Sequence, residues 1–252
     1  SWAELIPWVL LSGVAMGLYA PLRFSMIADE TSVEQRARAY SWANIAFLVG
    51  PTIGPSLGGI VADTYGIRAS FYVTGLLLAG SFATTLWLTE THNPNGARRR
   101  GKGTVSLTVP VLSTALLALF GVNAVQGVAV GLFSPVTPVF VTDRFAVDLT
   151  FVGALYAVGF GLSSLLGQIP GGRIADRWDR RMIVVTTGIA SAPFWALFAL
   201  SASAGELMAY MCLANGVLSL SWPALQALAM ELTPRSSWGF VNGLTSSGFW
   251  AG

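Results

Sequence analysis

The residues of this chain that could do chemistry are few and far apart. Its only histidine, His92, lies in a polar stretch, and its only cysteine, Cys212, lies in an apolar run. No nucleophile has a base nearby, no set of residues has the spacing of metal ligands, and no glycine-rich phosphate loop occurs. The sequence therefore gives no support to an enzyme, an ATP-driven pump, or a protein with a bound metal or cofactor.

Isolated polar side chains inside long apolar runs indicate where a binding cavity could lie. A polar side chain at membrane depth is costly, so each one is a candidate for lining a cavity that binds a substrate. The alternative is that the amides hydrogen-bond between packed helices, and that an arginine extends its charged end to the membrane surface. The candidates are Tyr19, Arg23, Asn123, Gln126, Asn215 and Gln226.

The composition is that of a membrane protein. Of the 252 residues, 54% are hydrophobic and only 10% are charged, whereas about a quarter of the residues in soluble domains are charged. The net charge of +2 is too small to indicate nucleic acid as a partner. We expect membrane lipids and a small-molecule substrate as partners instead.

Uncharged runs mark the expected membrane spans, since about 20 apolar residues cross a bilayer as a helix. The fourth run is long enough for two short helices around Gly121, but a split would invert every later loop. We therefore predict seven spanning helices and the start of an eighth. The runs cover residues 5–28, 39–62, 69–89, 103–142, 149–172, 182–205, 207–230 and 236–252.

The distribution of Lys and Arg supports single spans. One side of the predicted membrane then carries eleven basic residues and the other only Arg68 and Arg144. Because basic residues gather in cytoplasmic loops, the first side is predicted to be cytoplasmic, in the cell membrane. This side includes the polar linker 90–104, which separates a bundle in residues 1–89 from a second bundle in residues 105–252.

Two stretches share a skeleton, GGIVADTYGIR at 58–68 and GGRIADRWDRR at 171–181. The second resembles the cytoplasmic loop signature of the major facilitator superfamily, G-x-L-A-D-R-x-G-R-[RK], with Asp179 in place of a glycine. The matching residues that we assign to a gating loop are Gly172, Asp176, Arg177, Arg180 and Arg181.

The stretch GPTIGPSLGG at 50–59 resembles the antiporter signature of the same superfamily, G-x-x-x-G-P-x-x-G-G. Its glycines recur every four residues, so one helix face could admit a neighbouring backbone, and its prolines bend the same helix. Packing alone is the alternative explanation. The residues of this motif are Gly50, Pro51, Gly54, Pro55, Gly58 and Gly59.

The resemblance implies an all-α, polytopic transmembrane helical bundle, incomplete at both ends and covering helices four to eleven of twelve. In that family an acid such as Asp176 would pair with Arg180 and face the start of the last helix near Ser236, closing the inner side in one conformation. A solvated charged loop is the alternative. Pro135 and Pro138 would either stop the fourth run or form a hinge.

The resemblance therefore implies a secondary transporter that exports a small organic molecule by alternating access, with protons as the coupling ion. One alternative is uptake or facilitated transport of a sugar or other metabolite. Another is a membrane protein of this type that no longer transports.

Overall fold

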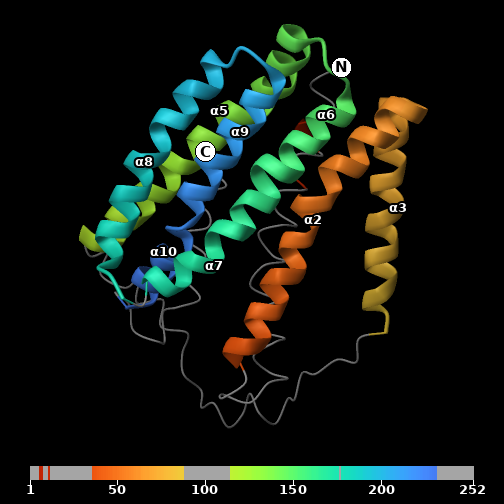
Figure 1. Ribbon diagram of the computed structural model, residues 1–252. Helices are drawn as coiled ribbons and strands as arrows, with labels where there is room; N and C mark the ends of the chain where they lie inside the picture. Colours follow the sequence, from red (N-terminus) through yellow and green to blue (C-terminus); the bar gives the residue numbers. More distant parts are fainter. Residues whose placement is uncertain (1–5, 8–10, 12–35, 88–113, 176, 232–252) are drawn as a thin grey trace.

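The computed structural model describes residues 6, 7, 11, 36–87, 114–175 and 177–231, and all regular structure in these ranges is helical (Figure 1). This confirms the predicted all-α class. The first and eighth predicted runs, apart from three residues, and the linker 90–104 lie outside these ranges. The helices are α2 (Arg36–Tyr65), α3 (Ile67–Thr85), α5 (Thr114–Phe145), α6 (Leu149–Ala154), the π-helix η1 (Leu155–Leu162), α7 (Ser163–Ala175), α8 (Arg180–Leu200), α9 (Ala204–Ser219) and α10 (Trp222–Glu231).

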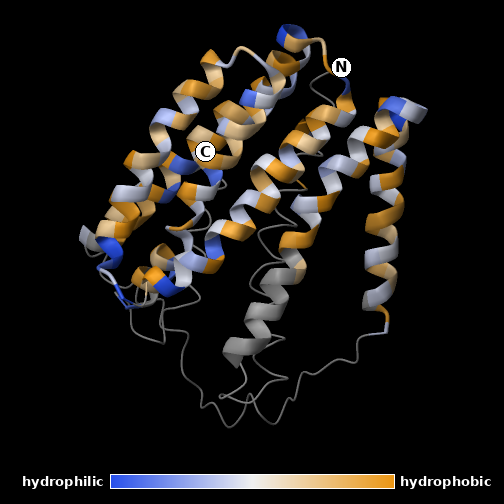
Figure 2. Ribbon diagram, viewed as in Figure 1, coloured by the Kyte–Doolittle hydropathy of each residue, from blue (hydrophilic) through white to orange (hydrophobic). Residues whose placement is uncertain are grey.

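Four stretches of the described ranges are long and apolar enough to cross a membrane: Leu116–Phe145, Leu149–Ala175, Arg180–Leu200 and Ala204–Leu228. They correspond to the fourth to seventh predicted runs, and α5 is continuous through Gly121, so the single-span interpretation is confirmed. The second and third predicted runs form α2 and α3. Figure 2 shows apolar residues along most of the length of the coloured helices.

Short polar connections set the ends of the helices. Asp148 accepts a hydrogen bond from Phe151 N at 2.8 Å at the start of α6, and Asp179 accepts one from Arg181 N at 2.8 Å at the start of α8. Such caps satisfy N–H groups that the first turn of a helix leaves without partners. From α5 onward, each spanning run is thereby separated from the next by only a few residues.

The C-terminal helices enclose the largest hydrophobic core. Leu155 of η1, Phe198 of α8 and Met211 of α9 are buried in it, together with Val141 of α5. Phe133 of α5 extends the core through an edge-on contact with Trp195 at 4.7 Å between ring centroids. Aromatic pairs of this geometry add to the energy of burial, so α5, η1, α8 and α9 form one packed body.

Pro135 and Pro138 lie inside α5, which continues to Phe145. Of the two alternatives for these prolines, a helix stop is therefore wrong, and a hinge stays a prediction. Pro138 has no N–H to donate to the carbonyl of Ser134, four residues earlier. The Tyr156 hydroxyl of η1 donates to that carbonyl at 3.0 Å, so a neighbouring helix supplies the missing partner.

Two irregularities were not predicted from the sequence. The fifth run contains the π-helix η1, a widened turn that often occurs at functional positions. The seventh run is interrupted at Leu220 and Ser221, between α9 and α10. Pro223 explains this break, because its ring and missing N–H disfavour a regular helix through the preceding turn.

α2 and α7 pack against different partners. α2 packs on α6 and η1, whereas α7 packs on α9 and α10. Figure 1 shows α2 crossing α6 and then separating from α7 toward the N-terminal end of α2. We call the end where α2 finishes and α6 begins the outer end, and the opposite end, where α7 finishes, the inner end. The two Gly-Gly-x-x-Ala-Asp stretches therefore lie at opposite ends of the bundle.

Candidate functional site

The contact between α2 and the α6–η1 segment is made by backbone against backbone. A Cβ on Gly161 of η1 would lie 2.6 Å from Thr52 Cα and 2.9 Å from Pro51 O. A Cβ on Gly153 would overlap the Pro55 carbonyl oxygen, and one on Gly59 would overlap the Leu149 carbonyl oxygen. Glycine is required at these three positions because any side chain would push the helices apart.

The face of α2 that contacts α6 and η1 carries one glycine of the motif, Gly59. Among the described residues, nothing lies within 4 Å of a Cβ built on Gly50, Gly54 or Gly58. The contacting face carries Pro51, Pro55 and Gly59 instead. Because successive helix residues are rotated by about 100°, a shift of one position selects a different face. A close backbone approach is therefore seen at Gly59, while the predicted approach at Gly50, Gly54 and Gly58 stays a prediction.

Pro55 also explains how η1 can approach so closely. It cannot donate to the Pro51 carbonyl, so this oxygen lacks its usual helical partner. The same oxygen faces Gly161, at 2.9 Å from the position of a Cβ. The antiporter-type prolines therefore present a freed carbonyl to the glycine of the neighbouring π-helix.

A carboxylate joins the two segments at the outer end. Asp63, in the last turn of α2, accepts hydrogen bonds from Leu149 N at 3.1 Å and from Thr150 N at 2.6 Å. These are N–H groups of the first turn of α6, where the helix dipole favours an anion. Hydrogen bonding from the Thr150 side chain, with smaller contributions from the two N–H groups, lowers the pKa of Asp63 against the opposing effect of burial.

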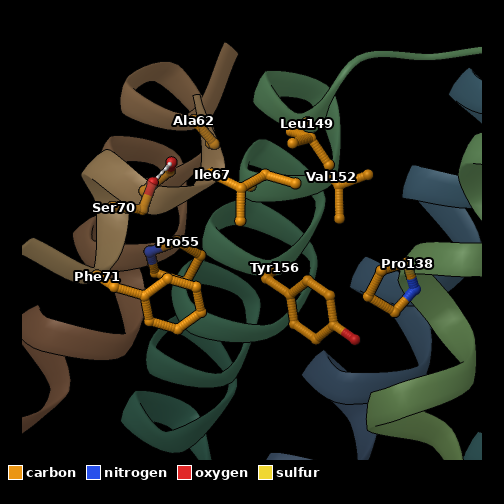
Figure 3. A pocket seen from close by; sticks show the side chains of 12 residues that line it. Pro55, Ala62, Ile67, Ser70, Phe71, Pro138, Leu149, Val152 and Tyr156 are labelled. Carbon is orange, nitrogen blue, oxygen red and sulfur yellow. Dashed lines mark hydrogen bonds between the residues drawn. The ribbon is translucent and has the colours of Figure 1, made fainter. Parts of the chain in front are cut away.

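An apolar pocket of about 380 Å³ opens beside this junction. Figure 3 shows Phe71 of α3, Pro55 of α2, Pro138 of α5 and Tyr156 of η1 around it. Ser70 of α3 lies at its edge and donates to the Gly58 carbonyl at 3.0 Å. The pocket thus adjoins the contact between the two bundles, and it offers apolar surface rather than charged groups.

The gating-loop residues lie at the inner end. Arg180 forms a salt bridge with Glu231 at the end of α10 and donates to the Ala175 carbonyl at 3.4 Å, while Arg177 and Arg181 are exposed. Asp176 lies outside the described residues, so its predicted pairing with Arg180 stays a prediction. Within the described part of the chain nothing lies within 4 Å of a Cβ on Gly172, whereas a Cβ on Gly171 would lie 2.7 Å from the Leu220 carbonyl oxygen.

The cavity-lining candidates in the described ranges lie on α5, α9 and α10. Asn215 of α9 is buried and donates to Met211 O at 3.0 Å, and Asn123 of α5 donates to Leu119 O at 2.9 Å. Both bonds return to the residue's own helix rather than crossing to another. Gln126 is half-buried and Gln226 exposed. Tyr19 and Arg23 lie outside the described residues, and a cavity lined by these candidates stays a prediction.

The sequence analysis did not identify three polar residues that the structure singles out. They are Asp63 of α2, Tyr156 of η1 and Ser164 of α7. Asp63 had a signal, because it occupies the place of Asp176 in the shorter copy of the repeated stretch. No sequence pattern indicates the role of Tyr156, since its hydrogen-bond partner Ser134 is 22 positions away. Ser164 Oγ is buried and has no hydrogen-bond partner among the described residues, which no sequence pattern indicates.

Comparison with known proteins gives the family context of this site. A family model described as Major Facilitator Superfamily matches residues 1–128 and 119–252. The chain is 26% identical to the multidrug resistance protein MdtG of Proteus mirabilis over 237 residues, which are 92% of this chain and 58% of that protein. It is 29% identical to the tetracycline resistance protein, class B, of Escherichia coli over 252 residues, covering 94% and 60%.

A third relative, the multi-drug resistance efflux pump PmrA of Streptococcus pneumoniae, is 26% identical over 230 residues, which cover 90% of this chain and 57% of the relative. The chain therefore spans about three fifths of the length of these relatives.

Proposed function

We propose, from the fact that this chain belongs to the Major Facilitator Superfamily, that it is part of a secondary transporter that exports a small organic molecule in exchange for protons. The chain is an integral membrane protein with helices of spanning length. The names of its relatives, which refer to multidrug and tetracycline resistance, support export of a lipophilic organic compound.

One structural observation carries the proposal. α2 of the first bundle is joined to α6 and η1 of the second at the outer end, while α2 and α7 separate toward the inner end (Figure 1). In alternating access, two bundles rock about a site near the middle of the membrane. The closed outer end is what an inward-open state requires, and we assign the described helices to that state.

The orientation follows from the charges. With the linker 90–104 and the Arg177–Arg181 loop in the cytoplasm, the inner end faces the cell interior and the outer end faces away from it. The proposed substrate thus enters from the cytoplasm and leaves after the outer contact opens. The gating loop at Gly172–Arg181 would close the inner end in that second state.

Flux in proteoliposomes tests this function. The protein, expressed with its native flanking sequence, is reconstituted with an acidic lumen, and uptake is measured for a lipophilic cation, tetracycline, a sugar and an organic acid. Proton-driven export predicts accumulation of the cation or tetracycline that an ionophore dissipating the pH gradient abolishes. Movement of a sugar or acid down its own gradient, unaffected by pH, would favour facilitated transport. No flux with any compound would favour a non-transporting protein.

A further inference from the structure

We propose that Asp63 is a permanently charged outer latch of the transport cycle: it holds α2 to the first turn of α6 while the outer end is closed, and it releases when that end opens. This proposal rests on the transport function above. Its basis is the pair of hydrogen bonds from Leu149 N and Thr150 N to the two carboxylate oxygens.

The geometry is specific to a contact between bundles. Asp63 is 86 and 87 residues away from its two donors, and α2 and α6 lie in the predicted N- and C-terminal bundles. The first turn of α6 already has a local cap, Asp148, which accepts from Phe151 N. Asp63 is therefore a second acceptor at this helix start. It accepts hydrogen bonds from the N–H groups of Leu149 and Thr150, which Asp148 leaves without partners.

The surrounding structure makes the contact sensitive to bundle position. Immediately inward of Asp63, Gly59 lies so close to the Leu149 backbone that no side chain fits between them. Any movement that separates α2 from η1 must therefore also carry Asp63 away from Leu149 N and Thr150 N. Water replaces the lost partners, since Asp63 is exposed.

The charge state of the latch follows from its neighbours. The other charged groups at the outer ends of α2, α3, α5 and α6 are Arg68, Asp143, Arg144 and Asp148. Among the described residues none of them forms a salt bridge with Asp63, and Arg144 donates instead to Ser201 O at 3.3 Å. Ionisation of Asp63 is thus favoured by the donors of α6 rather than by a cation.

Lowering the pH can only weaken the contact between Asp63 and α6. Because the closed state lowers the pKa of Asp63, the latch is at full strength above the ordinary carboxyl pKa of about 3.9 and weakens only as pH falls through the lower closed-state value. Between pH 5.5 and 8 the residue stays charged. Asp63 is therefore a latch and not the carrier of the coupling proton.

The repeated stretch extends this inference to the other end. Asp176 has the same place after Gly171 and Gly172 that Asp63 has after Gly58 and Gly59, and it follows directly on α7 at the inner end. The Gly-Gly-x-x-Ala-Asp stretch thus occurs twice, once at the end of α2 and once at the end of α7. In the state described here, the outer copy is the engaged one.

The test reads conformation and does not depend on finding a substrate. Spin labels are placed on Tyr65→Cys at the end of α2 and Ala202→Cys between α8 and α9, in a background without other cysteines. Both parent residues are exposed, and this outer reporter pair spans the two bundles. Distance distributions from pulsed electron spin resonance then give the ratio of outer-closed to outer-open molecules.

Asp63→Asn should shift that ratio about two- to five-fold toward outer-open, the range for a charge at an exposed helix terminus. Leu149→Pro should shift it in the same direction, because it removes one donor at the first helical position, where proline is tolerated. Asp143→Asn, which removes an exposed outer carboxylate from α5, should not shift it. The parent ratio should be equal at pH 5.5 and pH 8.

Equal ratios in the parent and both latch variants would overturn the latch, and so would an equal shift in Asp143→Asn. A change of the parent ratio between pH 5.5 and pH 8 that Asp63→Asn abolishes would instead make Asp63 a proton-operated switch and overturn its permanent charge. If the reporter pair behaves as expected but no compound is transported, the latch holds and the transport proposal fails.

Discussion

Replacing Gly161 by alanine should open the outer end. The added Cβ would lie 2.6 Å from Thr52 Cα, at least 0.8 Å short of ordinary contact at 3.4 Å, and 2.9 Å from Pro51 O. Both neighbours are backbone atoms, so no side chain can rotate away. The helices must separate to relieve the overlap, and overpacking of this kind costs about 1–3 kcal/mol.

This cost falls on one state only. When α2 and η1 are apart, the new methyl group meets no neighbour, so the outer-closed state loses about 1–3 kcal/mol relative to the outer-open state. The ratio of the two states should shift by roughly 5- to 150-fold. The gain in helix propensity from glycine to alanine applies to both states and cancels in this ratio.

The outer reporter pair measures this shift, with Gly54→Ala as the matched control. Gly54 lies in α2 at a similar depth, but among the described residues nothing is within 4 Å of its Cβ. We expect a large shift toward outer-open for Gly161→Ala and none for Gly54→Ala. Equal distance distributions for Gly161→Ala and the parent, in protein that remains folded and monodisperse, would refute the reasoning from backbone contact.

Three further predictions concern stability and are checked by thermal unfolding in detergent, followed by intrinsic fluorescence. Tyr156→Phe should lower stability by about 1 kcal/mol, because the Ser134 carbonyl, already without an N–H partner at Pro138, loses its donor; an unchanged midpoint would contradict this. Ser164→Ala should raise stability, since it removes a buried hydroxyl that has no partner in the described ranges, whereas Ser163→Ala, whose hydroxyl donates to Gly159 O, should lower it. Arg180→Gln and Glu231→Gln should each lower the free energy of unfolding by at most about 1 kcal/mol, because their salt bridge is partly exposed. The double variant should lower it by no more than the larger of the two single effects.

The helices could be predicted from sequence because each depends on its own composition. Uncharged runs between polar loops gave α5, α8 and the α6–α7 helix to within a few residues at most ends. Hydropathy measures the transfer of a segment into the membrane, and this requires no knowledge of neighbours. The same holds for the placement of the two Gly-Gly-x-x-Ala-Asp stretches at opposite ends.

Features that depend on a partner helix could not be predicted. Whether Pro138 stops α5 is decided by Tyr156 on another helix, which supplies a donor to Ser134. Which face of α2 is packed is decided by the position of η1, and a rotation of one residue separates Gly58 from Gly59. Periodicity shows that small residues share a face, but it contains no information about which face the neighbour meets.

The composition of the outer contact is compatible with the opening that the proposed transport cycle requires. Glycines and prolines bring backbones together at Pro51, Pro55 and Gly161, and a glycine adds no side chain to the contact. Asp63 adds directional bonds at an exposed position, where water replaces them on opening. A contact built from large buried side chains would favour one state too strongly for a cycle, because a difference of about 5.5 kcal/mol already moves a population from 1:99 to 99:1. The small residues of Gly50–Gly59 therefore suit the proposed cycle, in which this contact would open each time.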